Sequence, residues 1–511
     1  MVADPNRPHD AKTYKPNWEA SHHPARLEED LGGGVVRCHL SPRQCKMTPG
    51  KAGFCGVRMN VDGRLVTLNY GRATHITQES IETEAVFHYA PGAPILSLGN
   101  VGCMMNCDYC HNWKTSQARL VSSKDVRQYT PEQVVDIALQ RNIPVISWTY
   151  NDPVVWHEFV LDTSRLARQH GLRNLFKSAF YISLEGAAEL CEVIDIFSVS
   201  IKSMDPDWYR RITKGSLEPV LEATKFVFDQ GKHVEVSMLL VTDANDKVED
   251  TRRLADWVLT NLSDTVPIHY VRFHPDYKYT HVGRTPIERL VAAREAALEM
   301  GVKYCYLGNV YDSDAVHTYC TGCGSRLIER YGLNAHMVGL DDEGRCLQCR
   351  EPLIFKPLDF MRPALMTDLG RDLAMGGRQR REFLWHGDIR SLHVEAQNNA
   401  EAAGPIFCRR LNPDPGHGSP QEVRVGRNES YRFILSKSHP DETGVEIFSP
   451  AGFEVKLFEV YDRAHYPTID IDTAEMHGLN PVADRVPLPL YERPPRPSLS
   501  PSPGLRVLED V

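Results

Sequence analysis

Three cysteines fall within eight positions in the segment GNVGCMMNCDYCHNW, residues 99–113. Cys103, Cys107 and Cys110 follow the spacing CxxxCxxC. Cysteine thiolates are the usual ligands of iron–sulfur clusters, so three thiolates would leave one iron of a four-iron cluster open to a small molecule. A zinc ion bound by the three thiolates and His111 is the alternative, because zinc favours four such ligands. The segment therefore predicts a metal centre, and its spacing alone leaves both kinds open.

A second set of cysteines consists of two CxxC pairs that are separated by 22 residues. Two pairs at this spacing are a strong signature of a zinc ribbon, in which all four ligands come from the protein. We therefore expect a structural zinc ion, with rubredoxin-like iron as the alternative for the same geometry. The expected ligands are Cys320, Cys323, Cys346 and Cys349.

A third set, Cys38, Cys45 and Cys55, lies near the N-terminus, so that the three sets hold ten of the 13 cysteines. In a reducing compartment, clustered thiols are more often metal ligands than disulfides. The sequence therefore indicates a metalloprotein with more than one metal site. The other cysteines stand alone and are expected to be small buried hydrophobic residues: Cys191, Cys305 and Cys408.

The composition is that of a soluble globular protein, with 42% apolar and 24% charged residues and a formal net charge of −9. This balance shows no basic excess, which disfavours nucleic acid as the main partner. No apolar run approaches the ~18 residues that cross a bilayer. The first residues resemble neither a secretory signal nor a transit peptide. We therefore expect a cytoplasmic protein with no membrane partner.

Apolar runs typical of buried strands alternate with helical patterns between about residues 94 and 310. This alternation predicts a parallel sheet with right-handed crossovers, and six or seven units fit a full or partial βα barrel. In such barrels the chemistry lies on loops at the C-terminal ends of strands, and the three-cysteine segment directly follows the first expected strand. The expected strands are 94–99, 145–150, 197–202, 235–242, 268–274 and 304–310, and the expected helices are 131–142, 153–171, 185–194, 217–231, 247–262 and 287–301.

Changes of pattern along the chain predict five parts. An N-terminal segment with a cysteine-rich motif precedes the barrel, and a zinc-ribbon-like module follows it. A region with alternating apolar and polar residues then predicts a β-rich domain of unknown role, before a proline-rich tail. The expected ranges are 1–93, 94–312, 313–356, 357–490 and 491–511.

Several motifs in a fixed order resemble one family. The CxxxCxxC spacing with an aromatic Tyr109 before the last cysteine is similar to the radical S-adenosylmethionine (SAM) superfamily. The motifs CKMTPGKAGFCGVRMNVDGRL, TYNDPVVWHEFVLD and TYCTGCGSRLIERYG, between about residues 35 and 355, resemble the radical SAM component of the AmmeMemoRadiSam system. That component is related to the activating enzymes of glycyl radical enzymes. The resemblance implies an α/β fold: a partial (β/α)6-type radical SAM barrel with a zinc-ribbon-like appendage and a mostly β C-terminal extension.

The resemblance also implies the cofactors and their contacts. The first cysteine set would ligate a [4Fe-4S] cluster, and SAM would take the open iron and be cleaved to methionine and a 5′-deoxyadenosyl radical. Asn151 and Asp152 would contact the SAM amino group, although Asp152 could instead be only a helix N-cap. Lys202 and His274 occupy strand-end positions that approach SAM in relatives, and isolated residues of these types are otherwise structural or solvated.

Two regions differ from the activating enzymes. In those enzymes strand ends supply carboxylates to a monovalent cation near SAM, whereas this chain has Lys177 and Ser200 in the corresponding segments FKSA and SIK. Lys177 would fill the role of the cation or else point into solvent. In the N-terminal cysteine motif, Ser41 stands where relatives have a fourth cysteine. We expect this site to be weak or lost, to recruit His39, or to hold a labile ion.

The leading hypothesis is a radical SAM enzyme of the oxidoreductase or lyase type that abstracts hydrogen from an unidentified substrate. It would need a reductant such as flavodoxin or ferredoxin, and the resemblance implies Memo-like and AMMECR-like partners. One alternative is an activating enzyme that places a radical on a partner protein, which the missing acidic pair disfavours. The other is a catalytically inactive zinc-binding scaffold.

Overall fold

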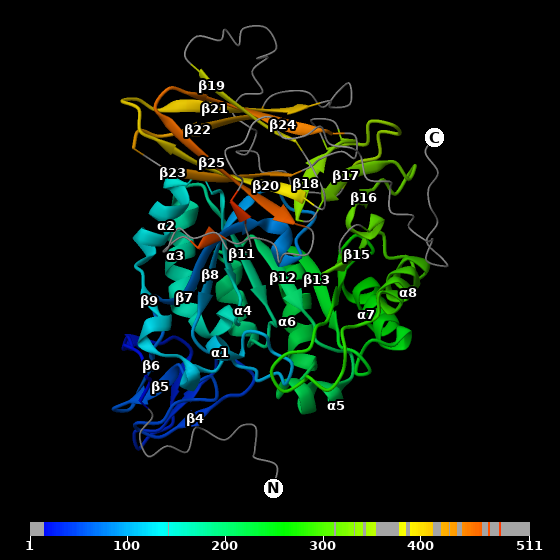
Figure 1. The fold of residues 1–511 in the computed structure, drawn as a ribbon. Coiled ribbons are helices and arrows are strands. Elements are labelled where there is room, and N and C mark those ends of the chain that lie inside the picture. Colours follow the sequence, from blue (N-terminus) through cyan, green and yellow to red (C-terminus); the bar gives the residue numbers. More distant parts are fainter. Residues whose placement is uncertain are drawn as a thin grey trace.

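The fold was established from a computed structural model of the 511-residue chain (Figure 1). The proline-rich tail expected at 491–511 lies outside the residues that the structure describes. The described residues are 15–141, 143–310, 313–331, 333–340, 344–353, 378–384, 389–411, 421–428, 430–436, 442–461, 469–470 and 480–481.

A sheet of mostly parallel strands forms the centre of the molecule (Figure 1). Seven strands run parallel and side by side in chain order, from β8 to β15. The antiparallel strand β7 (Arg72–Ser80) borders β8, and within the described residues no pairing joins β15 to β7. The sheet is therefore a partial barrel, as expected. The parallel strands are β8 (Pro94–Asn100), β10 (Val145–Thr149), β11 (Arg173–Ser178), β12 (Ile196–Ser200), β13 (His233–Leu240), β14 (Ile268–Arg272) and β15 (Cys305–Gly308).

The strand β11 is absent from the six apolar runs that the sequence indicated. Only Leu175 and Phe176 are apolar within it, because Lys177 and Ser178 turn the end of the strand polar. Parallel pairing with β10 on one side and β12 on the other makes it a central strand all the same. Because the end of β11 is polar, the search for apolar runs did not predict this strand.

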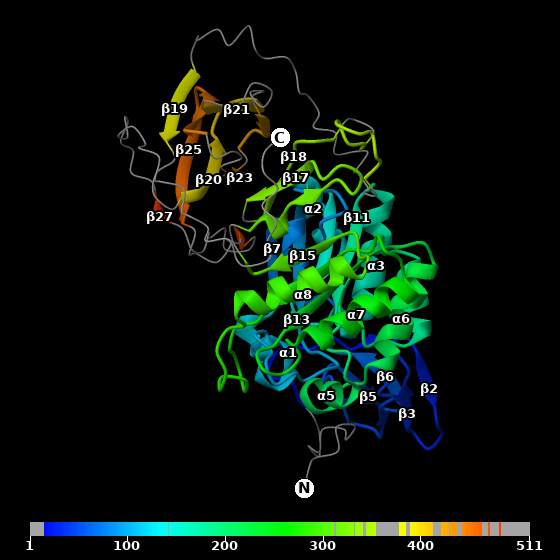
Figure 2. The ribbon, with the colours of Figure 1, turned by 90° about the vertical axis from the view of Figure 1, so that its right-hand side faces the viewer.

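Helices connect the parallel strands and cover the sheet (Figure 2). All six expected helices are present. The helix expected at 153–171 begins with a 3-10 turn, η4 (Pro153–Trp156), and Asp152 is the N-cap of that turn. The helices are α2 (Pro131–Gln140), α3 (His157–Gln169), α4 (Leu184–Cys191), α6 (Glu218–Asp229), α7 (Val248–Asn261) and α8 (Ile287–Glu299), with the short α1 (Trp113–Ser116) and α5 (Pro206–Trp208).

The N-terminal segment forms two small antiparallel sheets at the lower end of the molecule in Figure 1. A buried ion pair between Arg58 and Glu158, with Nη1 at 2.9 Å from the carboxylate, fixes this segment to α3. The strands are β1 (His23–Pro24), β2 (Glu28–Asp30), β3 (Val36–Cys38), β4 (Lys46–Met47), β5 (Arg58–Val61) and β6 (Arg64–Thr67), and a further strand, β9 (Arg127–Gln128), pairs with β7.

After the barrel, the described residues form strands, apart from the 3-10 helix η6 (Asp314–Val316). β16 (Thr318–Tyr319), β17 (Arg326–Tyr331) and β18 (Asn334–Met337) form a small antiparallel sheet around the CxxC pairs. Two four-stranded antiparallel sheets follow, which confirms a mostly β extension, and they share a buried apolar core. Their strands are β19 (Arg378–Leu384), β20 (Ile389–Asn398), β21 (Gly404–Leu411), β22 (Gln421–Val425), β23 (Ser430–Ser436), β24 (Gly444–Pro450), β25 (Phe453–Tyr461) and β27 (Asn480–Pro481), while β26 (Ile469–Asp470) pairs with β7.

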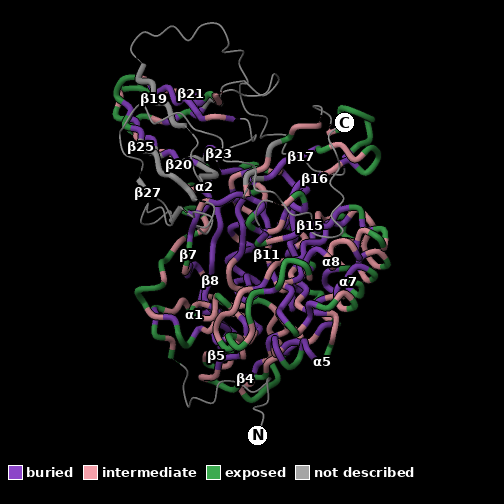
Figure 3. The backbone as a smooth tube through the Cα atoms, turned by 45° about the vertical axis from the view of Figure 1, so that its right-hand side comes forward, coloured by how far each residue is buried: buried purple, intermediate pink, exposed green. Residues whose placement is uncertain are grey.

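The central strands consist mostly of buried residues, which Figure 3 draws in purple. All five residues of β10, for example, are buried. Within the described residues, no helix combines the length and the apolar character that a membrane span requires.

Candidate active site

The three-cysteine loop leaves the C-terminal end of β8 and is held in place by its backbone. The amides of Asn106 and Asp108 donate to the carbonyls of Thr213 and Ile212 at 3.0 and 3.1 Å. Gly102 begins the loop with φ +93°, and a Cβ at this position would lie 2.9 Å from the carbonyl oxygen of Cys55. Only glycine fits there, because both the backbone angle and the close contact exclude a side chain.

The thiols of Cys103, Cys107 and Cys110 line one cavity of about 420 Å³. Burial raises the pKa of all three thiols, to about 12 for Cys107, while the Lys202 ammonium acts in the opposite direction on Cys107 and Cys110. Buried thiols facing a nearby ammonium fit an anionic iron–sulfur cluster, which replaces the thiol protons with metal.

A single zinc ion completed by His111 fits the loop less well. Within the described part of the chain, the only group of potential ligands whose donor atoms all lie within 4.8 Å of one another is the later set of four cysteines. The loop thiols are thus spread more widely than ligands of one ion, as thiolates bound to separate irons would be. His111 instead stacks on His274, with ring centroids 4.8 Å apart.

The TYNDP segment at the end of β10 reaches the same cavity. Tyr150 has φ +66°, and its ring packs so closely on Gly99 that a Cβ there would lie 2.9 Å from the ring. The Asn151 amide donates to the Asn100 carbonyl at 2.5 Å and accepts from the Thr115 hydroxyl at 2.8 Å. The strained backbone of Tyr150 is therefore held by contacts on both sides, which fixes the residues that follow.

Asp152 is buried and accepts three hydrogen bonds. The donors are the hydroxyl of Ser178 at 2.7 Å, the amide of Ala179 at 2.9 Å and the amide of Val154 at 3.2 Å. The last of these makes Asp152 the N-cap of η4, so the structural alternative is confirmed. Asp152 also lines the cavity, and its contact with SAM stays a prediction.

Lys202 and His274 come from the ends of β12 and β14. Lys202 lines the cavity near the thiols of Cys107 and Cys110. His274 contacts the cavity wall through its stacking on His111. The structure thus brings the four predicted SAM contacts to one edge of the sheet, and their roles toward SAM stay predictions.

Lys177 points into the barrel, so of the two alternatives left open by the sequence, the one in which it points into solvent was wrong. Its Nζ donates to the hydroxyls of Ser198 and Ser237, both at 3.0 Å, and Ser237 also contacts Ser200 at 3.0 Å. Burial lowers the pKa of Lys177 to about 8, while the charge of Glu84 acts in the opposite direction. An ammonium therefore lies in the cavity where the activating enzymes were expected to have carboxylates and a cation.

Two buried carboxylates of the cavity were missed by sequence analysis. Glu79 comes from β7, and Glu84 from the 3-10 helix η1 (Ile81–Glu84) that follows it. Glu84 accepts from Thr149 at 2.8 Å, and Glu79 accepts from the hydroxyl of Tyr150. Burial raises the pKa of both carboxyl groups. The sequence signal for these two carboxylates was weak, because nothing in the residues before the first expected strand predicted that β7 pairs with β8.

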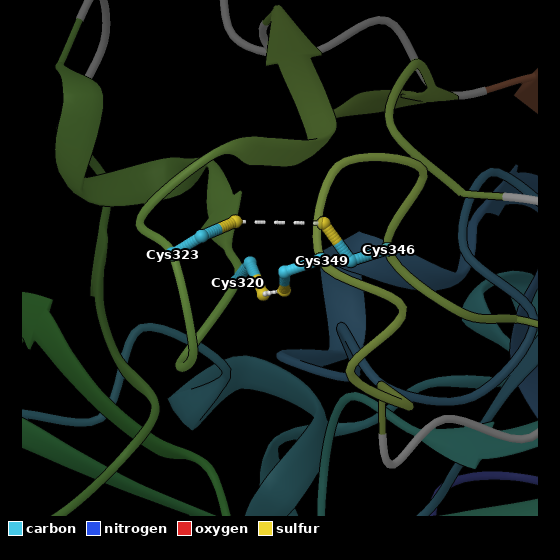
Figure 4. A group of neighbouring side chains, drawn as sticks. All are labelled: Cys320, Cys323, Cys346 and Cys349. Carbon is cyan, nitrogen blue, oxygen red and sulfur yellow. Dashed lines mark hydrogen bonds between the residues drawn. The ribbon is translucent and has the colours of Figure 1, made fainter.

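The four later cysteines converge from two loops, as Figure 4 shows. The Sγ atoms of Cys320 and Cys349 are 3.5 Å apart, and those of Cys323 and Cys346 are 3.6 Å apart. Such distances suit four thiolates around one ion, so this cluster can bind a metal such as zinc. The carbonyl of Cys320 and the amide of Gly324 close the first turn at 2.9 Å.

Comparisons with known proteins agree with this arrangement. The model of the radical SAM superfamily matches residues 98–255. A relative from Methanocaldococcus jannaschii, described as an uncharacterized protein, is 40% identical over 330 residues, which cover 64% of this chain and 98% of the relative. The chain belongs to the radical SAM superfamily. Radical SAM proteins use a [4Fe-4S] cluster and SAM, and the thiols of the three-cysteine loop suit that cluster.

Two further similarities concern activating enzymes. The pyruvate formate-lyase-activating enzyme of Listeria monocytogenes is 22% identical over 216 residues, which cover 40% of this radical SAM protein and 85% of the enzyme. A solved domain of the pyruvate-formate lyase-activating enzyme from Bacteroides vulgatus has 15% identity and a TM-score of 0.29, covering 32% of this chain and 98% of that domain. The resemblance to the AmmeMemoRadiSam component stays a prediction.

Proposed function

We propose that this radical SAM protein cleaves SAM by one-electron reduction and abstracts a hydrogen atom from a substrate that the sequence does not identify. The observation that carries the proposal is the cavity in which the loop thiols lie together with Asn151, Asp152 and Lys202. When bound, the cluster and SAM supply one electron and a 5′-deoxyadenosyl radical. The side chains of the cavity would bind SAM and orient it.

Asn151 and Asp152 would hold the SAM amino group. A carboxylate that faces an ammonium makes a charge-assisted hydrogen bond, which is stronger than a neutral one. Asp152 is suited to this role because three donors fix the position of its carboxylate, which lines the cavity. Asn151 is fixed equally well by its bonds to Asn100 and Thr115.

Lys202 would pair with the SAM carboxylate, because its ammonium group lies near the thiols of Cys107 and Cys110. His274 would act as a positioning residue, since its ring stacks on His111 directly after the loop. The surrounding barrel would exclude water from the radical, which prevents side reactions.

Lys177 would replace the monovalent cation of the activating enzymes. Its ammonium is held by two serine hydroxyls inside the cavity and needs no added ion. This substitution also disfavours the alternative that the protein activates a partner by placing a radical on it. The similarity to activating enzymes keeps that alternative open as a second candidate.

The remaining expectations concern partners and location. We propose a flavodoxin or ferredoxin as the electron donor, because cleavage of SAM requires one external electron. Memo-like and AMMECR-like partners and a cytoplasmic location are retained as predictions from the sequence.

The direct test is anaerobic reconstitution with iron and sulfide, followed by reduction with dithionite in the presence of SAM and measurement of 5′-deoxyadenosine. We expect product from the natural protein and at least about 100-fold less from Cys107→Ala. Cys191→Ala is the matched control, since Cys191 lies on α4 outside all three cysteine sets, and it should behave like the natural protein. No product from a protein shown to contain its cluster would refute radical chemistry and favour the scaffold hypothesis.

A further inference from the structure

We propose that Cys38, Cys45 and Cys55 bind a second iron–sulfur cluster next to the three-cysteine loop. The proposal concerns metal binding alone and does not depend on whether SAM is cleaved. It replaces the expectation from the sequence that this site is weak or lost. His39 takes no part, because its Nε2 lies 2.8 Å from a carboxylate oxygen of Glu29 on the neighbouring strand.

The three thiols line one cavity, although they come from different elements. Cys38 ends β3, Cys45 precedes β4, and the Cys38 amide donates to the Cys45 carbonyl at 3.0 Å. Cys55 lies in the turn before β5. Gly53 leaves room for the thiol of Cys45, since a Cβ there would lie 3.4 Å from that sulfur atom. The hairpin and the turn thus point three thiols at one place.

The arrangement fits a cluster better than a single ion. Within the described residues, the sulfur atoms of the four zinc-ribbon-like cysteines all lie within 4.8 Å of one another. The sulfur atoms of Cys38, Cys45 and Cys55 are spread more widely, as are those of the three-cysteine loop. This wider spacing favours several metal ions over one.

A buried guanidinium supplies a hydrogen-bond donor to the cavity. Arg58 lines the cavity and is 2% exposed. Its Nη1 binds both carboxylate oxygens of Glu158, and its Nη2 donates to the Arg26 carbonyl. Its Nε is also buried but has no hydrogen-bond partner among the described residues. Buried donors are normally satisfied, and sulfur atoms of iron–sulfur clusters commonly accept such N–H groups.

A second guanidinium connects this cavity to the three-cysteine loop. Arg43 lines the cavity and donates to the Met104 carbonyl in the loop at 2.6 Å. Positive charge between two anionic clusters would stabilise both, so the two centres are expected to be neighbours.

The test uses the full chain, reconstituted anaerobically with iron and sulfide. In the variant Cys103→Ala/Cys107→Ala/Cys110→Ala, which removes the loop ligands, we expect iron, sulfide and the visible absorption of a cluster to persist. Adding Cys38→Ala and Cys55→Ala should then remove nearly all iron and leave the zinc of the later cysteines. A loop variant that contains zinc but no iron would overturn the proposal.

Two further measurements separate loss of a ligand from loss of folding. Ser41 lines the same cavity, so Ser41→Cys should supply a fourth thiolate and slow the removal of iron by a chelator at least about tenfold in the loop variant. An unchanged rate would count against a cluster at this place. Thiol titration of the denatured, metal-free protein should find all three thiols reduced, and a disulfide among them would also overturn the proposal. Cys191→Ala is the matched thiol control and should leave the iron content unchanged.

Discussion

The carboxylate of Asp152 accepts a hydrogen bond from the hydroxyl of Ser178 at 2.7 Å. Asp152 follows β10 and Ser178 ends β11, so this contact joins two neighbouring strand ends at the mouth of the cavity. The amide of Ala179 adds a second bond to the same carboxylate at 2.9 Å. The position of the charge is therefore set by the parallel pairing of the two strands.

Asp152→Asn should weaken SAM binding, because it removes the charge and keeps the shape of the side chain. Hydrogen bonds to charged groups contribute about 1.5–3 kcal/mol, so the KM for SAM should rise at least about tenfold. The comparison variant is Ser178→Ala, which removes one hydrogen-bond donor to Asp152 and leaves the charge of the carboxylate. Its KM for SAM should change less than about threefold. Similar effects of the two variants would show that the charge of Asp152 does not contact SAM.

Lys177→Met should make SAM cleavage depend on a monovalent cation. The natural protein should form 5′-deoxyadenosine equally well with and without added potassium, because its ammonium already occupies the cavity. The variant should lose most activity in the absence of potassium and recover part of it when the salt is added. The exposed lysine Lys225, paired with Asp229 on α6, provides the control variant Lys225→Met. Potassium dependence of the natural protein would contradict the proposed role.

Formation of 5′-deoxyadenosine should decline above about pH 8. Burial lowers the pKa of Lys177 to about 8, so the side chain carries its charge below that pH and loses it above. Activity that requires the ammonium should then fall up to about tenfold per pH unit on the alkaline side. In Lys177→Met this alkaline decline should be absent, and the residual activity should be flat between about pH 7.5 and 9.5. The same decline in the variant would assign it to another group.

Glu158→Gln should strongly destabilise the fold, because it leaves the buried guanidinium of Arg58 without a countercharge. Both side chains are at most 3% exposed, and breaking such a pair costs about 3–5 kcal/mol. Thermal unfolding followed by fluorescence should show a clear drop in the midpoint. The exposed pair of Arg252 and Glu299 provides the control, since Glu299→Gln should cost less than about 1 kcal/mol. Equal midpoints for the two variants would contradict the structural role of the buried pair.

Cys346→Ala should release zinc and leave the barrel intact. Zinc content should fall from about one ion per chain to nearly none, because four thiolates complete the shell. The iron content should not change, since the loop thiols lie in a separate cavity. Limited proteolysis should cut faster between residues 313 and 353, because small ribbons depend on their metal for folding. Retention of zinc by this variant would exclude the four-thiolate site.

The sequence by itself determined the features that depend on local order. The spacings of Cys103, Cys107 and Cys110 and of the two CxxC pairs are properties of short segments, so these cysteines could be predicted directly as candidate metal ligands. The alternation of strands and helices was readable for a similar reason, because apolar periodicity and helix caps act over a few residues. Within the described residues, it predicted the six long crossover helices and all but one of the parallel strands.

Only the tertiary structure decided which side chains share the cavity. Glu79 and Glu84 reach it because β7 pairs antiparallel with β8, a contact between segments with no local signal in the sequence. Lys177 points inward because successive residues of a strand face opposite sides and its register beside β12 places it opposite Ser198. Arg43 contacts the three-cysteine loop from 61 residues earlier in the chain. Pairing and register are long-range consequences of packing, which a single sequence does not display.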